Sequence, residues 1–533
     1  MKPNTKNNQE TENVIPTKIY ILIAVGFILL VVPIISLLMD TQMVLIKHMT
    51  RIANGSNVYN MLQEEIPGAF VHVYVFNITN GDAFLSGEDD KLKLQEVGPF
   101  IYQEYRKNDQ FELDEEAGVM RYTPRLWTKF VPEGSVGDPH KINVTVPNAA
   151  LLAMASMLSD YPFLTKTGFN ILASRLNTPT LMNMDVHSQL WGYEEPLISV
   201  GNTLLPGWIT FSKMGLLDRL YDPAAIPRFE LGITNEDKFR IKTLDGARGL
   251  SVWDYENPSK RTRCNTLVDT YEGIAYPPAL SPKTKLRLYR NVFCRMIDLD
   301  LVGTRTIDYG PEALIYKVNN DTFNIGPNTE CLCGKRACKN GVSDLSPCLY
   351  NLPMALSHAH FLHADPQLYE RIEGIHPDEM KHGSEIVVDP KVGVVLQTRF
   401  TLQISVDIQD VSYNRQAKPF SNMVVPLAYF TIIQGELPEE GKQAIKSLHV
   451  NFFYMVHGSE IATFILGLVI LLYAGRTVFW SVICSNRLSY KISKLKKPSN
   501  NIVQVEEPLM NENNFSHIKV LESEIYCTKI QEP

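Results

Sequence analysis

The residues best suited to covalent chemistry are the eight cysteines, six of which lie between positions 264 and 348. An even set of cysteines on an oxidising side of a membrane predicts disulfides, and six would form about three bridges. The alternative is a zinc site made by the last four, although their spacing lacks the C-x2-C pattern of such sites. Spacing alone leaves about fifteen pairings open. The six are Cys264, Cys294, Cys331, Cys333, Cys338 and Cys348.

A second cluster of reactive side chains contains His358, His360 and His363, with Asp365 nearby. Imidazoles and a carboxylate at this spacing could bind a metal, but a packed structural role is the interpretation we favour. The chain has neither a G-x-S-x-G nucleophile elbow nor a G-x-x-x-x-G-K-[ST] phosphate loop. Its net charge of -7 comes without a basic stripe for nucleic acid. We therefore expect no enzyme activity, no cofactor and no metal.

Four asparagines carry the N-x-[ST] acceptor pattern for N-glycosylation, namely Asn54, Asn77, Asn143 and Asn320. This pattern is typical of surface loops on the extracytoplasmic side of a membrane. A fifth acceptor, Asn514, lies near the C-terminus and should stay unmodified if that end is cytoplasmic. The four sites therefore predict that the middle of the chain is exported.

Two apolar segments near the ends are long enough to cross a bilayer. The first covers residues 19–39 without a charge, and it exceeds the apolar stretch of a signal peptide, which is the alternative. The second covers residues 461–484 and contains Arg476. That arginine lies about 22 Å along the helix, where its side chain can reach the headgroups. Trp480 suits the same interface.

The charges beside the second segment predict the orientation of the chain. Five basic residues follow it, Arg487, Lys491, Lys494, Lys496 and Lys497, which is typical of the cytoplasmic side. Residues 1–18 and 485–533 should then be cytoplasmic, with residues 40–460 outside the cell or in a lumen. Cys484 lies where the second span meets the cytoplasm, which suits palmitoylation, although an unmodified thiol fits equally well.

The central region alternates between apolar and polar residues in several places, which predicts antiparallel strands with one buried face. The clearest example runs from Phe400 to Ile408, and a shorter one covers residues 71–75. Residues 147–195 differ, because they are rich in Ala, Leu and Met. We expect helices there over Ala149–Leu158, Phe163–Leu176 and Met182–Trp191.

Several motifs spread along the central region resemble the class B scavenger receptor family. The matching residues are Val73-Tyr-Val-Phe-Asn77, Val97-Gly-Pro-Phe-Ile-Tyr102, Leu190-Trp-Gly-Tyr-Glu-Glu-Pro196, Tyr276-Pro-Pro278, Cys331-Leu-Cys333 and His360-Phe361-Leu362. The last motif departs from the family pattern, because Ala359 replaces a proline. Together with two spans, these motifs cover nearly the whole exported region.

The resemblance implies a mixed α+β fold. It implies an irregular antiparallel β-barrel ectodomain with an apical helix bundle at about residues 147–195 and a hydrophobic tunnel, anchored by two transmembrane helices. It also implies the disulfides Cys264–Cys331, Cys294–Cys348 and Cys333–Cys338. At the apex, Lys166 and Arg175 would hold carboxylates or phosphates, and Phe163 would guard the tunnel mouth. The alternatives are solvated surface charges and an ordinary core aromatic.

The resemblance implies a scavenger or lipid-uptake receptor that binds lipid-carrying particles or anionic ligands and passes lipid through the tunnel. Its expected partners are the membrane, a lipoprotein or other lipid carrier, and lipids such as fatty acids, sterols, carotenoids or phospholipids. Homo-oligomerisation stays open. The alternatives to a cell-membrane receptor are an endosomal or lysosomal receptor that traffics a partner protein, and a sensory lipid co-receptor. The tail motifs Glu506-Glu-Pro-Leu-Met510 and Tyr526-Cys-Thr-Lys529 match sorting signals incompletely.

Overall fold

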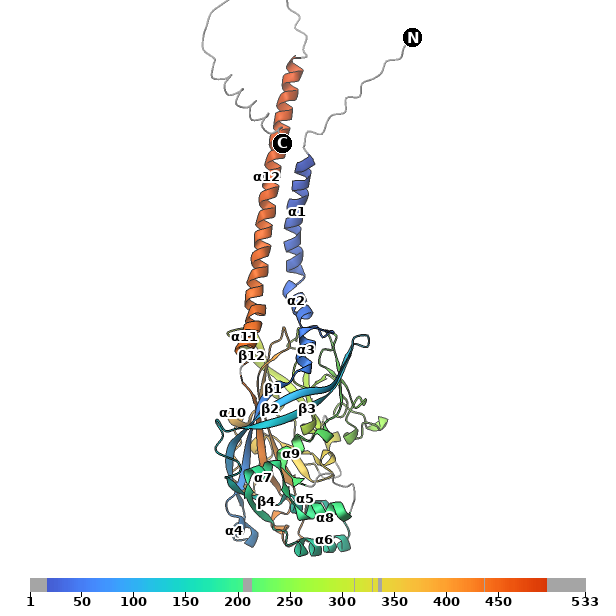
Figure 1. Ribbon diagram of the computed structural model, residues 1–533, viewed down its shortest axis with the longest axis vertical. Coiled ribbons are helices and arrows are strands. Elements are labelled where there is room, and N and C mark those ends of the chain that lie inside the picture. Colours follow the sequence, from blue (N-terminus) through green and yellow to red (C-terminus); the bar gives the residue numbers. More distant parts are fainter. Residues whose placement is uncertain are drawn as a thin grey trace, which may run out of the picture. The chain divides into compact units, whose positions relative to one another are not determined.

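The computed structural model describes residues 17–204, 213–310, 312–327, 329–333, 338–435 and 437–495 (Figure 1). Contacts group the chain into two compact units. One contains the residues up to Val44 and from Asn451 onward, and the other is Leu45–Val450. Lys496, Lys497, Asn514 and both tail motifs lie outside the described residues.

The terminal unit consists of two helices long and apolar enough to cross a membrane. Helix α1 covers Thr17–Leu38, and helix α12 covers Phe452–Leu495, which extends beyond the predicted span at both ends. The helices pack closely where Gly26 faces Gly467, because a Cβ atom on Gly467 would lie 3.0 Å from the Gly26 carbonyl oxygen. Small residues allow this approach in membrane helix pairs. Cys484 is partly buried in α12.

In the described residues of the central unit, fifteen strands form one large, mostly antiparallel sheet. An isolated antiparallel bridge between Arg240 and Tyr271 joins the two ends of the strand order, so the sheet is nearly closed and resembles a barrel. The main order is β10 (Thr270–Tyr271), β11 (Leu286–Arg290), β12 (Arg295–Thr306), β13 (Glu312–Val318), β17 (Glu385–Val388), β18 (Val395–Asp407), β19 (Val424–Gln434), β1 (Ile66–Ile78), β2 (Leu92–Asp114), β3 (Val119–Val131), β8 (Phe229–Gly232) and β9 (Ile241–Leu244).

The remaining strands are short. In the large sheet, β14 (Ser343–Asp344) pairs with β15 (Met354–Ser357), which also pairs with β18, and β16 (Ile372–Glu373) pairs with β2. Two separate pairs are β4 (Asn143–Pro147) with β5 (Leu181–Asp185), and β6 (Tyr193–Glu194) with β7 (Lys213–Met214). The strands predicted at residues 71–75 and 400–408 are therefore confirmed as parts of β1 and β18.

One expectation about β18 is wrong, because the strand buries both faces. Its polar residues Thr401, Gln403 and Ser405 are as fully buried as its apolar ones. Residues outside the strand form hydrogen bonds with it. The Gln403 side-chain oxygen accepts the His360 N–H at 2.8 Å, and the Ser384 hydroxyl accepts the Thr401 N–H at 3.0 Å. Alternation in sequence here reflects two different buried surfaces, one apolar and one hydrogen-bonded.

Two of the three predicted helices are confirmed. Helix α5 covers Ala149–Met157, where Asn148 caps its first turn, and helix α6 covers Phe163–Arg175. The prediction of a helix over Met182–Trp191 is wrong in its first half. Residues Leu181–Asp185 form strand β5 against β4, and only Val186–Trp191 is helical, as α7. Long-range pairing overrides local helix propensity in this segment.

The other helices of the central unit are shorter or peripheral. They are α2 (Thr41–Met49), α3 (Asn57–Gln63), α4 (Gly81–Ser86), α8 (Pro196–Leu204), α9 (Leu216–Leu220), α10 (Glu379–His382) and α11 (Glu439–Lys446). Two disulfides join the region after β13 to earlier parts of the chain, and a third closes a short loop within that region. They join Cys264 to Cys331, Cys294 to Cys348 and Cys333 to Cys338, the same pairs that the resemblance implies.

The four glycosylation acceptors of the central unit lead to a prediction about topology. Asn54, Asn143 and Asn320 are exposed, whereas Asn77 is partly buried and its side-chain oxygen accepts the Thr145 N–H at 2.8 Å. We expect glycosidase treatment to lower the apparent mass of the protein from cells. An antibody to the C-terminal tail should bind only after permeabilisation, and staining of the tail on intact cells would contradict this orientation.

Candidate functional site

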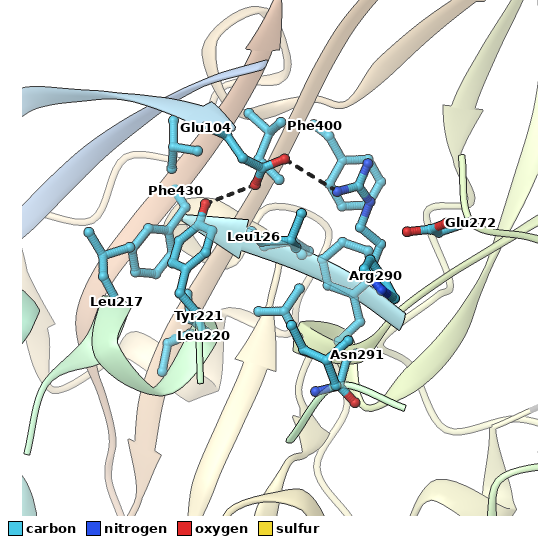
Figure 2. A pocket seen from close by; sticks show the side chains of 18 of the residues that line it. Glu104, Leu126, Leu217, Leu220, Tyr221, Glu272, Arg290, Asn291, Phe400 and Phe430 are labelled. Carbon is cyan, nitrogen blue, oxygen red and sulfur yellow. Dashed lines mark hydrogen bonds and ion pairs between the residues drawn. The ribbon is translucent and has the colours of Figure 1, made fainter. Parts of the chain in front are cut away.

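A cavity within the central unit is the candidate site (Figure 2). The space between its lining atoms is about 890 Å³, which includes the part that opens to solvent. Residues of β1, β2, β3, β8, β11, β15, β18 and β19 line it. Strands this far apart in the strand order can face one space only if that space lies inside the barrel-like sheet.

One wall of the cavity is apolar and comes from three neighbouring strands. Phe400 pairs with Ile432 and Leu402 pairs with Phe430, so side chains of β18 and β19 alternate on the same inner face. Ile404 and Val71 continue this wall. Because side chains alternate between the two faces of a strand, Phe400, Leu402 and Ile404 all point into the cavity.

Strand β2, the neighbour of β1, carries a buried polar strip, of which Glu104 lines the cavity. Glu104, Arg106 and Asn108 occupy alternate positions and are all buried, each no more than 9% exposed. Asn108 accepts a hydrogen bond from Arg106 Nε at 3.0 Å and donates one to the Leu62 carbonyl at 2.8 Å. Sequence reasoning missed this strip, because charged residues two apart ordinarily indicate the solvent face of a strand.

Arg106 of this strip belongs to a buried ion-pair network with Glu272 and Tyr122. The Arg106 guanidinium donates hydrogen bonds to both oxygens of the Glu272 carboxylate, and the bond from Nη2 to Oε2 measures 2.8 Å. The Tyr122 hydroxyl donates to the same carboxylate at 2.8 Å. Burial alone would raise the pKa of Glu272, but the attraction of Arg106 holds that pKa below its ordinary value. Glu272 is therefore a charged group with its partners already in place.

A second, more open polar group faces the cavity. The Tyr221 hydroxyl donates to Glu104 at 3.0 Å, and Arg290 lies with a guanidinium nitrogen 3.8 Å from the other Glu104 oxygen (Figure 2). That separation is an ion pair but too long for a hydrogen bond. Burial, and then the charge of Glu104, raises the pKa of Tyr221 well above its ordinary value, so its hydroxyl stays a donor.

A wider groove lies beside the cavity and shares Leu126 and Tyr221 with it. Trp127 and Trp191 form part of its lining, together with the charged residues Glu65 and Arg125. Trp191 belongs to the Leu190-Trp-Gly-Tyr motif. The shared residues place this groove next to the cavity on the side of β3 and α9.

The predicted ligand-capture residues all lie on α6 and none of them lines the cavity. Phe163, at the start of the helix, is 79% exposed, and Arg175, at its end, is exposed as well. Lys166 is partly buried with its ammonium 5.2 Å from the centre of the Tyr413 ring. The exposed pair could contact a large ligand in solvent, and their role in capture stays a prediction.

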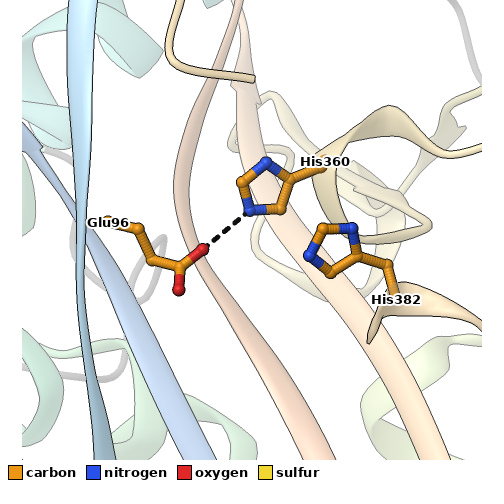
Figure 3. A group of neighbouring side chains, drawn as sticks. All are labelled: Glu96, His360 and His382. Carbon is orange, nitrogen blue, oxygen red and sulfur yellow. Dashed lines mark hydrogen bonds and ion pairs between the residues drawn. The ribbon is translucent and has the colours of Figure 1, made fainter. Parts of the chain in front are cut away.

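The predicted cluster of histidines is divided among several partners. His360 Nε2 lies 3.0 Å from a Glu96 oxygen, with the His382 ring stacked at 4.2 Å (Figure 3). His363 contacts Glu379 instead. Asp365 accepts the Gln367 N–H and so begins a short helix. The four residues nominated from the sequence therefore do not form one site, although Glu96, His360 and His382 have ligand atoms within 4.8 Å of one another.

The hydrogen bonds of this trio disfavour metal binding. His360 Nδ1 accepts the His376 N–H at 3.1 Å, and His382 Nδ1 accepts the Asp378 N–H at 3.2 Å. A neutral imidazole that accepts at Nδ1 carries its hydrogen on Nε2, so the nitrogens that face Glu96 are donors rather than metal ligands. The geometry suits a buried hydrogen-bond network better than a cation site.

Two buried histidines predict that acid destabilises the central unit. Burial lowers the pKa of His358 to about 3 and the pKa of His382 to about 4. The unfolded chain, with a pKa near 6.5, therefore binds more protons than the fold between about pH 6.5 and pH 4. We expect stability to fall by roughly 2 kcal/mol per histidine between pH 7 and pH 5. Denaturant midpoints of the full chain measured across this range would show it.

The variant His358→Phe isolates one of the two groups, because neither ring nitrogen of His358 has a hydrogen-bond partner among the residues that the structure describes. An apolar ring there should keep the packing against Phe323 and lose part of the pH dependence. His48→Gln, at an exposed position, is the matched control and should follow the unmodified chain. Parallel pH profiles for all three proteins would contradict the assignment.

Comparison with known proteins identifies the family. The CD36 family model matches residues 19–478, which is most of the chain. Bovine (Bos taurus) scavenger receptor class B member 1 is 27% identical over 433 residues, 79% of this chain and 81% of that protein. Mouse (Mus musculus) lysosome membrane protein 2 is 24% identical over 419 residues, 76% and 83% of the two chains. Protein peste of Drosophila melanogaster is 27% identical over 340 residues, 60% and 58%.

The family match extends from the first apolar helix through the barrel-like sheet into the second apolar helix. It therefore includes both membrane helices, the six disulfide-bonded cysteines and every strand that lines the cavity. This chain is a membrane protein that belongs to the CD36 family.

Proposed function

We propose that this protein is a scavenger receptor for lipids, which takes a lipid from a carrier into the cavity of its central unit and passes it to the membrane that anchors it. The observation that carries the proposal is the largely apolar cavity inside the nearly closed, barrel-like sheet. Removing an alkyl chain from water gains roughly 0.8 kcal/mol per CH2, so an enclosed apolar space is a favourable route for a poorly soluble molecule. The names of the mammalian relatives as scavenger receptors support the same role.

The donor of the lipid would be a lipoprotein or another lipid carrier, held outside the cavity. Helix α6 is a candidate surface for it, because Phe163, Leu164 and Ile171 are exposed there, and the cation of Arg175 is exposed at the end of the same helix. Apolar contact together with a positive charge suits a particle with an anionic lipid or protein surface. Capture on α6 and passage through the cavity would then be separate steps.

The test of this proposal is to identify the lipids that accompany the protein. The full chain, purified from cells in a mild detergent, should carry long-chain lipids that mass spectrometry detects. A cavity-filled variant, Leu126→Trp with Leu402→Trp, should carry less, because both residues line the cavity. Val302→Trp adds the same ring to an exposed position of β12 and serves as the control.

Equal lipid content in all three proteins would show that the lipid is detergent-bound rather than cavity-bound. Absence of lipid from the unmodified chain, with a co-purifying protein instead, would favour the function of a trafficking receptor for a partner protein. The mouse relative named lysosome membrane protein 2 keeps an endosomal or lysosomal location among the outcomes.

A further inference from the structure

The polar group that faces the cavity is electrically balanced, which restricts the lipids it can accept. Glu104, Glu272 and Arg290 line the cavity, and Arg106, which is not among the lining residues, supplies the second positive charge through its ion pair with Glu272. Arg106 is committed to Glu272 by its two contacts, so Arg290 is the one cation that faces the empty space among the described lining residues. Arg290 already neutralises Glu104, and no cation is left over for an anionic ligand.

The contact between Arg290 and Glu104 is an ion pair without a direct hydrogen bond. Their nearest nitrogen and oxygen are 3.8 Å apart, and no hydrogen bond from the guanidinium is found within the described parts of the chain. Its side chain keeps 25% of its surface exposed, against 12% for Glu104. The guanidinium therefore has unused donors that face the cavity, and the carboxylate has an oxygen that can accept.

A hydroxyl group satisfies both partners at once, because it accepts from a guanidinium and donates to a carboxylate. A carboxylate or phosphate ligand cannot do so. It would have to share the single guanidinium with Glu104, and two buried negative charges that share one cation repel each other. An ester would accept from Arg290 but could not donate to Glu104, whose second oxygen would gain no hydrogen bond.

We propose that the cavity selects uncharged lipids that end in a hydroxyl group, through joint recognition by Arg290 and Glu104, and discriminates against lipid anions. This inference rests on the proposed function, since it names the chemical class that the same cavity takes. The apolar wall formed by Phe400, Leu402 and Phe430 would hold the hydrocarbon part. A long-chain alcohol or a sterol has this chemistry, whereas a fatty acid at neutral pH does not.

The test compares three ligands of equal chain length on the full chain in lipid nanodiscs at pH 7.4. Radiolabelled hexadecanol, methyl palmitate and palmitate would be exchanged from cyclodextrin. Leaving a buried charged group poorly paired is unfavourable, so hexadecanol should bind at least about tenfold tighter than palmitate. Methyl palmitate should lie between them. Palmitate binding as tightly as hexadecanol would overturn the inference without any variant.

The variant Glu104→Gln should reverse the selectivity, because it frees Arg290 from its anion. We expect palmitate to gain about tenfold in affinity and hexadecanol to lose a smaller factor. Glu116→Gln removes the same charge from an exposed turn and should leave all affinities unchanged. An unchanged ratio in Glu104→Gln would also overturn the inference. Failure of all three ligands to bind the unmodified chain would instead refute the lipid cavity itself.

Discussion

Filling the cavity should abolish lipid uptake while the receptor still reaches its membrane. In cells that express Leu126→Trp with Leu402→Trp, we expect uptake of a fluorescent lipid from a lipoprotein particle to fall to the level of cells without the protein. Both residues line the cavity, and each indole adds bulk where the lipid chain would lie. Some overpacking strain is expected, about 1–3 kcal/mol, but the empty space lowers it. Uptake and surface amount would be measured on the same cells.

Two other variants separate passage through the cavity from capture of the particle. Val302→Trp changes an exposed position of the same sheet and should take up lipid normally. Arg175→Glu, on α6, should weaken binding of the particle in a salt-dependent way, since exposed charges are screened over about 8 Å at physiological salt. If the cavity-filled variant folds and still takes up lipid, passage through the cavity is wrong and the protein binds and traffics its ligand only.

Local sequence patterns predicted the elements whose neighbours are near in the chain. The apolar helices at both ends, α5 and α6, and strands β1 and β18 follow from runs of suitable residues. Leu181–Asp185 did not follow, because its strand depends on pairing with residues 143–147, and α12 continues well beyond its apolar core. Hydrophobic periodicity and secondary-structure propensity contain no information about strand partners that are distant in the sequence.

The cavity could be predicted only in part. The alternation from Phe400 to Ile404 indicated an apolar face, and that face proves to line the cavity. The polar strip of β2 was beyond reach, because residues 103–109 have the composition of an exposed strand. Arg106 finds its carboxylate 166 positions away, and Tyr221 lies 117 positions from Glu104. A buried charge becomes recognisable only when its partner is known.

The ion pair of Arg106 and Glu272 should be the most sensitive point of the barrel. We expect Arg106→Leu to destabilise the protein by about 3–5 kcal/mol, because it leaves Glu272 as a buried charge without its cation. The side chains of this pair are only 10% and 5% exposed, so water cannot replace the lost partner. The loss would be measured from denaturant midpoints of the full chain, or from the amount of protein that acquires mature glycans in cells.

Removal of both charges gives the matched control. Replacing a buried ion pair by apolar residues of similar volume is often neutral. Adding Glu272→Leu to Arg106→Leu should therefore restore much of the lost stability. Tyr122→Phe is included because the Tyr122 hydroxyl would otherwise lose its acceptor. Relative to the unmodified chain, the single variant should also lose less stability as the pH falls. Without Arg106, burial raises the pKa of Glu272 above its unfolded value, so the fold gains from protonation while the unfolded chain stays ionised. If Arg106→Leu alone were as stable as the variant without both charges, and had the same pH dependence as the unmodified chain, Glu272 would not need its arginine.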